Sequence, residues 1–173
     1  GREGAGMSIL ATVPARQIVS VSQDVRAPRR EVYAAFLDPL RLAAWYGPEG
    51  WIVPVHTISL DARPGGILRL AMVHHENPGQ AVPLYSTFVS VVPEQLLEHR
   101  ESLPGPDGQA SDAQVLHRIE FLEREVDGAP GTRVVLSQGP LPTEVHPGVA
   151  AAWRSSLRRL AHTVQAETAR PRG

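Results

Sequence analysis

The sequence predicts an α+β domain in which a curved antiparallel sheet wraps around one long C-terminal helix. β-prone runs follow one another along most of the chain, with turn residues between them, which is typical of hairpins. Residues 149–164 place apolar side chains at spacings of three and four, which predicts an amphipathic helix. Since no other helical segment is long enough to cover one face of the sheet, this helix is expected to lie against it.

The first elements are a strand and two short helices. Residues 17–25 mix valine and isoleucine with polar residues and predict a strand. Pro28 suits the first position of a helix, which ends at Pro39. A second short helix is expected over residues 40–45 and stops at Gly47.

Six further strands are expected in the middle of the chain. The β-prone runs are residues 52–60, 67–73, 85–92, 96–103, 115–126 and 132–137. A Pro-Gly-Gly turn at 64–66 joins the first two, and Asn77, Pro78 and Gly79 mark the next turn. Residues 104–112 are expected to form a polar surface loop. A sheet that curves around a helix leaves an apolar space wherever side chains do not fill it.

A chain of 173 residues fits one domain with a sizeable core. Residues 1–6 precede Met7 and are expected to be an addition ahead of the native start. Residues 7–16 are expected to be an N-terminal extension, 17–166 the domain, and 167–173 a tail.

Composition excludes several classes of function. The formal net charge is −1 and the basic residues, all arginine, are scattered, so nucleic acid is not an expected partner. The absence of cysteine excludes disulfides and agrees with a cytoplasmic location. No apolar run is long enough to insert into a membrane. The histidines form no metal-binding motif and no nucleotide fingerprint occurs, so neither a metal nor a cofactor is expected.

Six short motifs resemble one known family. They are APRREVYAAFLDP at 27–39, WYGP at 45–48, RPGG at 63–66, PEQLL at 93–97, GTR at 131–133 and WRSSLRRL at 153–160. In this order they resemble the heat-shock-protein-90 ATPase activator-like branch of the START and SRPBCC superfamily, over residues 17–164. The resemblance implies the helix-grip fold, whose members include lipid carriers, polyketide cyclases and stress proteins. Tyr46 stands where a second tryptophan is common in that family.

The expected pocket residues come from several elements. The candidate ligand-binding residues are Trp45, Tyr46, Leu68, Leu70, Met72, Phe88, Ser90, His117, Ile119, Trp153 and Leu157. Alternation places Phe88 and Ser90 on one face of a strand, and His117 on an otherwise apolar face. The alternative for Trp45 and Tyr46 is packing that closes one end of the sheet, and the alternative for His117 is a satisfied core histidine.

Three functions follow from this reading. The first is binding of a small hydrophobic or aromatic molecule in the internal cavity. The second is a cofactor-free cyclase, isomerase or hydrolase, in which His117 or Tyr85 would move a proton. The third is a chaperone-associated interaction domain that uses an exposed apolar patch. A homodimer is left open.

Overall fold

In a computed structural model, which describes residues 7–170, the protein forms one eight-stranded antiparallel sheet. The strands are β1 (Val19–Val25), β2 (Trp51–Ile52), β3 (Ser59–Leu60), β4 (Ile67–His74), β5 (Asn77–Val92), β6 (Leu96–Pro104), β7 (Ala110–Val126) and β8 (Ala129–Gly139). The helices are α1 (Arg29–Leu37), α2 (Pro39–Trp45) and α3 (His146–Thr168), with 3₁₀ turns at Ala15–Gln17, Val55–Thr57 and Thr143–Val145. The strand order is β1-β8-β7-β6-β5-β4-β2, and β3 pairs with β4.

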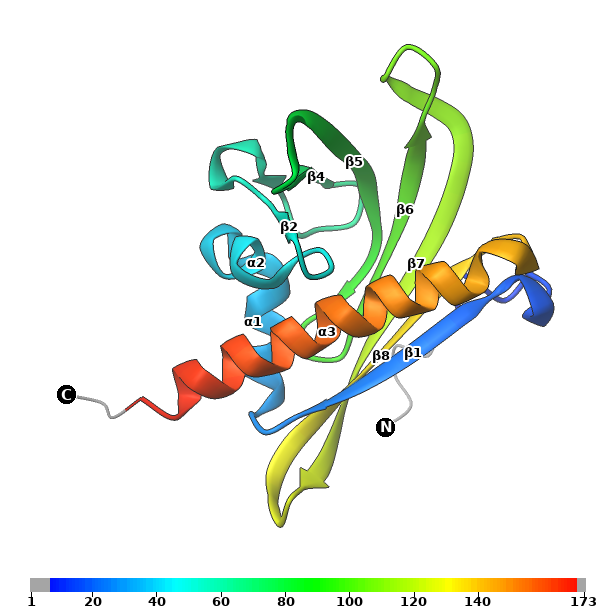
Figure 1. The fold of residues 1–173 in the computed structure, drawn as a ribbon. Coiled ribbons are helices and arrows are strands. Elements are labelled where there is room, and N and C mark those ends of the chain that lie inside the picture. The colour runs from blue at the N-terminus through cyan, green and yellow to red at the C-terminus, as the bar shows by residue number, and fades with distance from the viewer. Residues whose placement is uncertain (1–6, 171–173) are drawn as a thin grey trace.

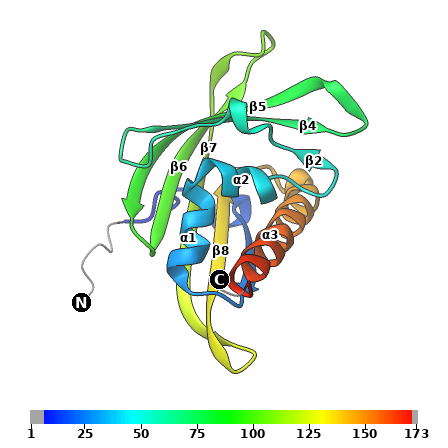
Figure 2. The same cartoon turned by 90° about the vertical axis from the view of Figure 1, so that its left-hand side faces the viewer.

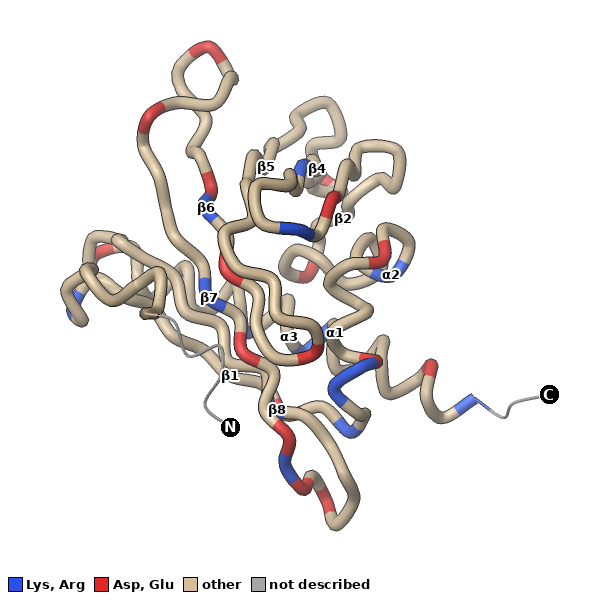
Figure 3. Tube along the Cα trace, turned by 180° about the vertical axis from the view of Figure 1, so that it is seen from behind, with Lys and Arg blue, Asp and Glu red and all other residues tan. Residues whose placement is uncertain are grey.

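The sheet curls around the helices. Figure 1 shows α3 crossing the concave side of the sheet, and Figure 2 shows α1 and α2 beside it inside the same curve. This confirms the predicted fold class, a curved antiparallel sheet around a long C-terminal helix. Among residues 7–170, no helix is long and apolar enough to cross a membrane. Figure 3 shows basic and acidic residues interspersed along the chain rather than gathered by sign.

The core lies between α1, α2, α3 and the inner face of the sheet. Phe36 and Phe121 meet edge to face with ring centroids 5.2 Å apart, and Phe36 packs the same way on Trp45 at 4.8 Å. Trp45 is fully buried, and its indole N–H donates to the Ala35 carbonyl at 2.9 Å. Such pairs stabilise a core beyond the area they bury. Trp45 therefore has the packing role that the sequence left open, and it does not line the cleft described below.

The segment expected as one strand over residues 52–60 is divided. Only its ends pair with β4, as β2 and β3, and a 3₁₀ turn after Pro54 separates them. Proline has no N–H to give to a ladder, so the chain leaves the sheet edge there. The Thr57 hydroxyl donates to the Pro54 carbonyl and accepts from the Ala71 N–H, which fixes the turn against β4.

Two other expected boundaries differ. The turn between β4 and β5 is His75 and Glu76, so Asn77 to Gly79 already belong to β5. The loop expected at 104–112 is shorter, because β6 continues to Pro104 and β7 begins at Ala110.

The N-terminal segment covers part of the outer face of the sheet. The Ile9 N–H donates to Glu98 at 2.9 Å, and Leu10 is buried. Arg118 also donates to Glu98, at 2.7 Å, so this nearly inaccessible carboxylate is paired. A buried charge with both partners in place is satisfied. The outer face is therefore polar and structural around β6.

Candidate functional site: a cleft beneath the C-terminal helix

A cleft of about 330 Å³ lies between the first half of α3, the loop after α2, and strands β4 to β6. It is lined by Tyr46, Gly47, Pro48, Met72, Val82, Pro83, Leu84, Glu101, Leu103, Pro104, Gln138, Val149, Ala152, Trp153 and Ser156. Most of these side chains are apolar, and of the described residues that line it Glu101 is the one Asp, Glu, Lys, Arg or His. A concave, largely apolar site with a few polar groups is typical of small-molecule binding.

The cleft exists because α3 divides its packing between two regions. Its second half buries Leu157, Leu160 and Val164 in the core. Its first half presents Ala152 and Trp153 to the cleft instead. The apolar face of α3 therefore packs in the core along its second half and lines the cleft along its first half.

Loop 47–51 is fastened to α3 at the edge of the cleft. The Arg159 guanidinium donates to three backbone carbonyls of this loop, those of Gly47, Pro48 and Trp51, at 2.6 to 3.2 Å. Gly47 has a positive φ of 95°, which a residue with a Cβ rarely adopts. This wall of the cleft is thus held by charge-assisted hydrogen bonds.

Polar side chains form a cluster of two hydrogen-bonded pairs beside the cleft. His117 Nε2 lies 2.9 Å from Glu101 Oε1, and the Trp153 indole N–H donates to Gln138 Oε1 at 2.8 Å. Because a carboxylate oxygen only accepts, His117 Nε2–H donates to Glu101. Gln138 Nε2 lies 3.4 Å from the same His117 nitrogen. Because that nitrogen carries the proton, it has no lone pair to accept from Gln138, and this long contact is packing.

His99 stacks on His117 below the cleft. The two rings are 4.3 Å apart and nearly parallel, at 14°. The Ser86 hydroxyl lies 2.5 Å from His99 Nδ1 and donates to the Arg100 carbonyl at 3.1 Å. A hydroxyl has one hydrogen, so Ser86 accepts from His99 Nδ1–H. Burial and, to a smaller extent, the neighbouring His117 lower the pKa of His99 well below its ordinary value, so its imidazole is neutral.

Tyr46 joins the cleft to a smaller cavity deeper in the core. This cavity, about 20 Å³ and large enough for one water molecule, is also lined by His99 and Trp153. Burial, reinforced by the negative charge of Glu101, raises the pKa of the Tyr46 phenol far above its ordinary range. Tyr46 therefore remains a neutral hydroxyl, able to donate a hydrogen bond.

The remaining candidate residues from the sequence fall into four groups. Tyr46, Met72 and Trp153 line the cleft. Leu68, Phe88 and Ile119 line the small cavity beneath it. Leu70 and Leu157 are buried in the core, and His117 lies in the polar cluster.

Ser90 does not share a face with Phe88, contrary to the prediction. Phe88 pairs with His99 and Ser90 pairs with Glu98, so Val89 is an extra residue in β5. Such a β-bulge reverses the alternation that follows it. Ser90 therefore lies on the outer face with Glu98, away from the cleft.

Tyr85 is also displaced from the predicted role. It alternates with the buried residues Leu84 and Ser86 and so points to the outer face of β5. Its hydroxyl donates to the Gly108 carbonyl at 3.2 Å, in the loop between β6 and β7. Tyr85 cannot move a proton inside the cleft from this position.

Sequence reasoning missed Glu101, Gln138, His99 and Ser86. A signal for two of them is present in β6, where Leu97, His99, Glu101 and Leu103 recur at every second position. These residues share one face, and two ionisable groups on a face with leucine indicate a functional pair.

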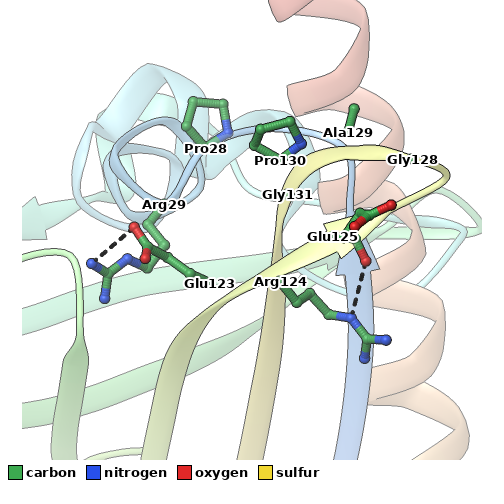
Figure 4. Close-up of a pocket in the computed structure, with 9 residues that line it drawn as sticks. All are labelled: Pro28, Arg29, Glu123, Arg124, Glu125, Gly128, Ala129, Pro130 and Gly131. Carbon is green, nitrogen blue, oxygen red and sulfur yellow. Dashed lines mark hydrogen bonds and ion pairs between the residues drawn. The ribbon is translucent and has the colours of Figure 1, made fainter.

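A second depression, of about 500 Å³, lies at the β7–β8 hairpin and the start of α1 (Figure 4). Its walls include Glu123, whose side chain is 76% exposed and pairs with Arg29 at 3.2 Å, and Arg124, which contacts the Glu125 carbonyl at 3.4 Å. An exposed pair of this kind contributes little binding energy. The cleft beneath α3 is the better candidate site.

Among residues 7–170, no group of three or more His, Cys, Asp or Glu side chains is arranged to hold a metal ion. His117, Glu101 and His99 are instead engaged with one another and with Ser86. The cluster therefore offers hydrogen-bonding groups rather than a metal site.

Solved structures share this architecture. A protein from Chromobacterium violaceum is 23% identical, with a TM-score of 0.69 over 86% of this chain and 97% of its own. The AHSA1 protein from Silicibacter pomeroyi is 24% identical, with a TM-score of 0.73 over 87% and 99%. A protein from Nitrosomonas europaea is 19% identical, with a TM-score of 0.72 over 91% and 100%. At these identities the likeness concerns the fold alone.

No curated protein matches the chain. A family does: the one described as Activator of Hsp90 ATPase homolog 1-like protein matches residues 26–165. This range runs from the end of β1 nearly to the end of α3 and contains the whole cleft. The chain therefore belongs to the Activator of Hsp90 ATPase homolog 1-like family of the SRPBCC superfamily.

Proposed function

We propose that this protein binds a small hydrophobic or aromatic molecule in the cleft beneath α3. One observation carries the proposal: a cleft of about 330 Å³ whose walls are mostly apolar and whose polar groups are few. Its volume is within the range of small-molecule sites.

The apolar walls supply the driving force. A ligand that buries about 200 Å² of apolar surface gains about 5 kcal/mol from leaving water, before the cost of ordering it is subtracted. Trp153 and Tyr46, whose rings meet edge to face at 5.9 Å, provide aromatic surface beside the cleft. Aromatic ligands are therefore favoured.

A cleft-blocking substitution tests the proposal. Ala152→Phe places a ring in the cleft, and we expect at least a tenfold loss of affinity for aromatic probes such as 2-naphthol, measured by calorimetry. Ala151→Phe is the matched control, because Ala151 is the preceding residue of α3 and is exposed. Equal affinities of the two variants and the unaltered protein would show that the probe binds elsewhere.

A second candidate function is proton transfer on a bound hydrophobic substrate. The observation that favours it is the Glu101–His117 pair, in which a carboxylate at the cleft is oriented by a buried imidazole. A base of this kind could exchange an acidic C–H of a bound ketone with solvent. Deuterium uptake from heavy water, followed by mass spectrometry, checks this, and unchanged uptake in Glu101→Gln would exclude the carboxylate as the base.

The chaperone-associated role stays a prediction from the family resemblance. A cytoplasmic location likewise stays a prediction, which is based on the absence of cysteine.

A further inference from the structure

We infer that Glu101 makes the cleft selective for hydrophobic molecules that end in a neutral hydrogen-bond donor, such as a phenol or an alcohol, and against molecules that end in a carboxylate. The inference rests on the proposed function and names the class of ligand.

Glu101 has unused acceptor capacity at the cleft. Its Oε1 accepts from His117 Nε2 at 2.9 Å, and this is the one side-chain hydrogen bond of Glu101 among the described residues. A carboxylate offers about four acceptor positions on its two oxygens. The side chain is 16% exposed, and it lines the cleft, so the remaining positions are available to a ligand.

His117 holds the carboxylate of Glu101 in place. The imidazole is fully buried and stacked on His99 at 4.3 Å, so its ring orientation is fixed. When its Nε2–H donates to Glu101, its Nδ1 has no partner in the described part of the chain, so a second proton on the ring would be buried without an acceptor. Glu101 thus remains an acceptor for what enters the cleft.

Within residues 7–170, no basic side chain lines the cleft to compensate the negative charge of Glu101. On the loop side, the guanidinium of Arg159 donates to the carbonyls of Gly47, Pro48 and Trp51, and Arg159 does not line the cleft. A ligand carboxylate would therefore meet Glu101 as a like charge in an apolar setting, where repulsion is stronger than in water.

A purely apolar ligand is disfavoured for a different reason. It would cover the carboxylate and remove its water without replacing the lost hydrogen bond, which is costly for a charged group. A neutral donor replaces that water directly. A hydrogen bond to a charged acceptor corresponds to a preference of about tenfold or more.

Three probes of nearly equal size separate these cases. They are 2-naphthol, 2-methylnaphthalene and 2-naphthoate, titrated into the whole protein by calorimetry near neutral pH. We expect 2-naphthol to bind at least about tenfold more tightly than 2-methylnaphthalene, although the latter is the more hydrophobic, and 2-naphthoate to bind most weakly.

The Glu101→Gln variant tests the residue. It keeps the size of the side chain and removes its charge, so the penalty against 2-naphthoate should shrink by about tenfold or more. Glu120→Gln is the matched control, because Glu120 lies on the outer face of β7 between the buried Ile119 and Phe121, and we expect it to leave the ranking unchanged. Should Glu101→Gln fail to fold by circular dichroism, the ranking of probes on the unaltered protein decides alone.

The outcomes distinguish the two proposals. If the probes bind with equal affinity, or 2-naphthoate binds best, the role of Glu101 is wrong while the ligand-binding cleft stands. If none of the probes binds, the cleft proposal fails and the inference fails with it.

Discussion

His99 and His117 form the least expected feature at the residue scale, a stacked pair of imidazoles with little access to water. The interior position of His117 follows from the sequence, because Val115, Ile119 and Phe121 alternate with it. The identity of its partners does not follow from the sequence. They come from β6 and α3, and which residues face each other depends on a register that no local pattern specifies.

Protonation of His99 is expected to link stability to pH. Burial lowers its pKa in the folded state well below the ordinary 6.5, so below that pH the unfolded chain binds a proton that the folded protein does not. The free energy of unfolding should therefore be greatest above about pH 6.5 and fall as the pH decreases toward the folded-state pKa, by at most about 1.4 kcal/mol per pH unit from this group.

Urea unfolding between about pH 7.5 and pH 5.5 measures this effect. His99→Gln removes the titrating group and leaves His117 and Glu101 in place, so its stability should fall less over the same interval. Parallel curves for the two proteins would contradict the assignment to His99.

At the scale of elements, the turn between β3 and β4 supports the strand that lines the small cavity. The Gly65 N–H donates to the Phe88 carbonyl, and the Phe88 N–H donates to the Gly66 carbonyl, both at 2.8 Å. These two hydrogen bonds lie next to the bulge at Val89. The Pro-Gly-Gly signal predicted the turn, but not its contact with β5.

Gly66→Ala should destabilise the fold. A Cβ at Gly66 would overlap the backbone carbonyl oxygen of Asp61, which cannot move without breaking the turn. We expect the free energy of unfolding to fall by at least about 2 kcal/mol, as measured in urea.

Gly79→Ala is the matched control for this prediction. A Cβ there meets nothing within 4 Å, so the change should stay within about 0.5 kcal/mol. Similar losses for both alanine variants would contradict the close approach at Asp61 as the cause.

The bulge at Val89 and the break at Pro54 mark the limits of sequence pattern at this scale. Proline was visible in the run 52–60, and its missing N–H explains why the strand divides. The run 85–92 contains no glycine or proline to signal an extra residue. Alternation alone therefore placed Ser90 on the wrong face.

For the whole molecule, one apolar stripe on α3 predicted the relation between helix and sheet. The helix is fastened at its C-terminal end, where Arg41 of α2 reaches Glu31 of α1 at 2.9 Å and Glu167 of α3 at 2.7 Å. The first half of α3 forms one wall of the cleft. Where the core stops and the cleft begins depends on loop 46–48 and on the strands facing it, so the stripe could not reveal it.

The most direct test of the ligand-binding cleft is nuclear magnetic resonance of the ¹⁵N-labelled protein titrated with 2-naphthol. Binding in the cleft predicts saturable shifts that gather on its residues, above all Tyr46, Glu101, Gln138 and the indole N–H of Trp153. Shifts confined to the β7–β8 hairpin, or none that saturate, would contradict it.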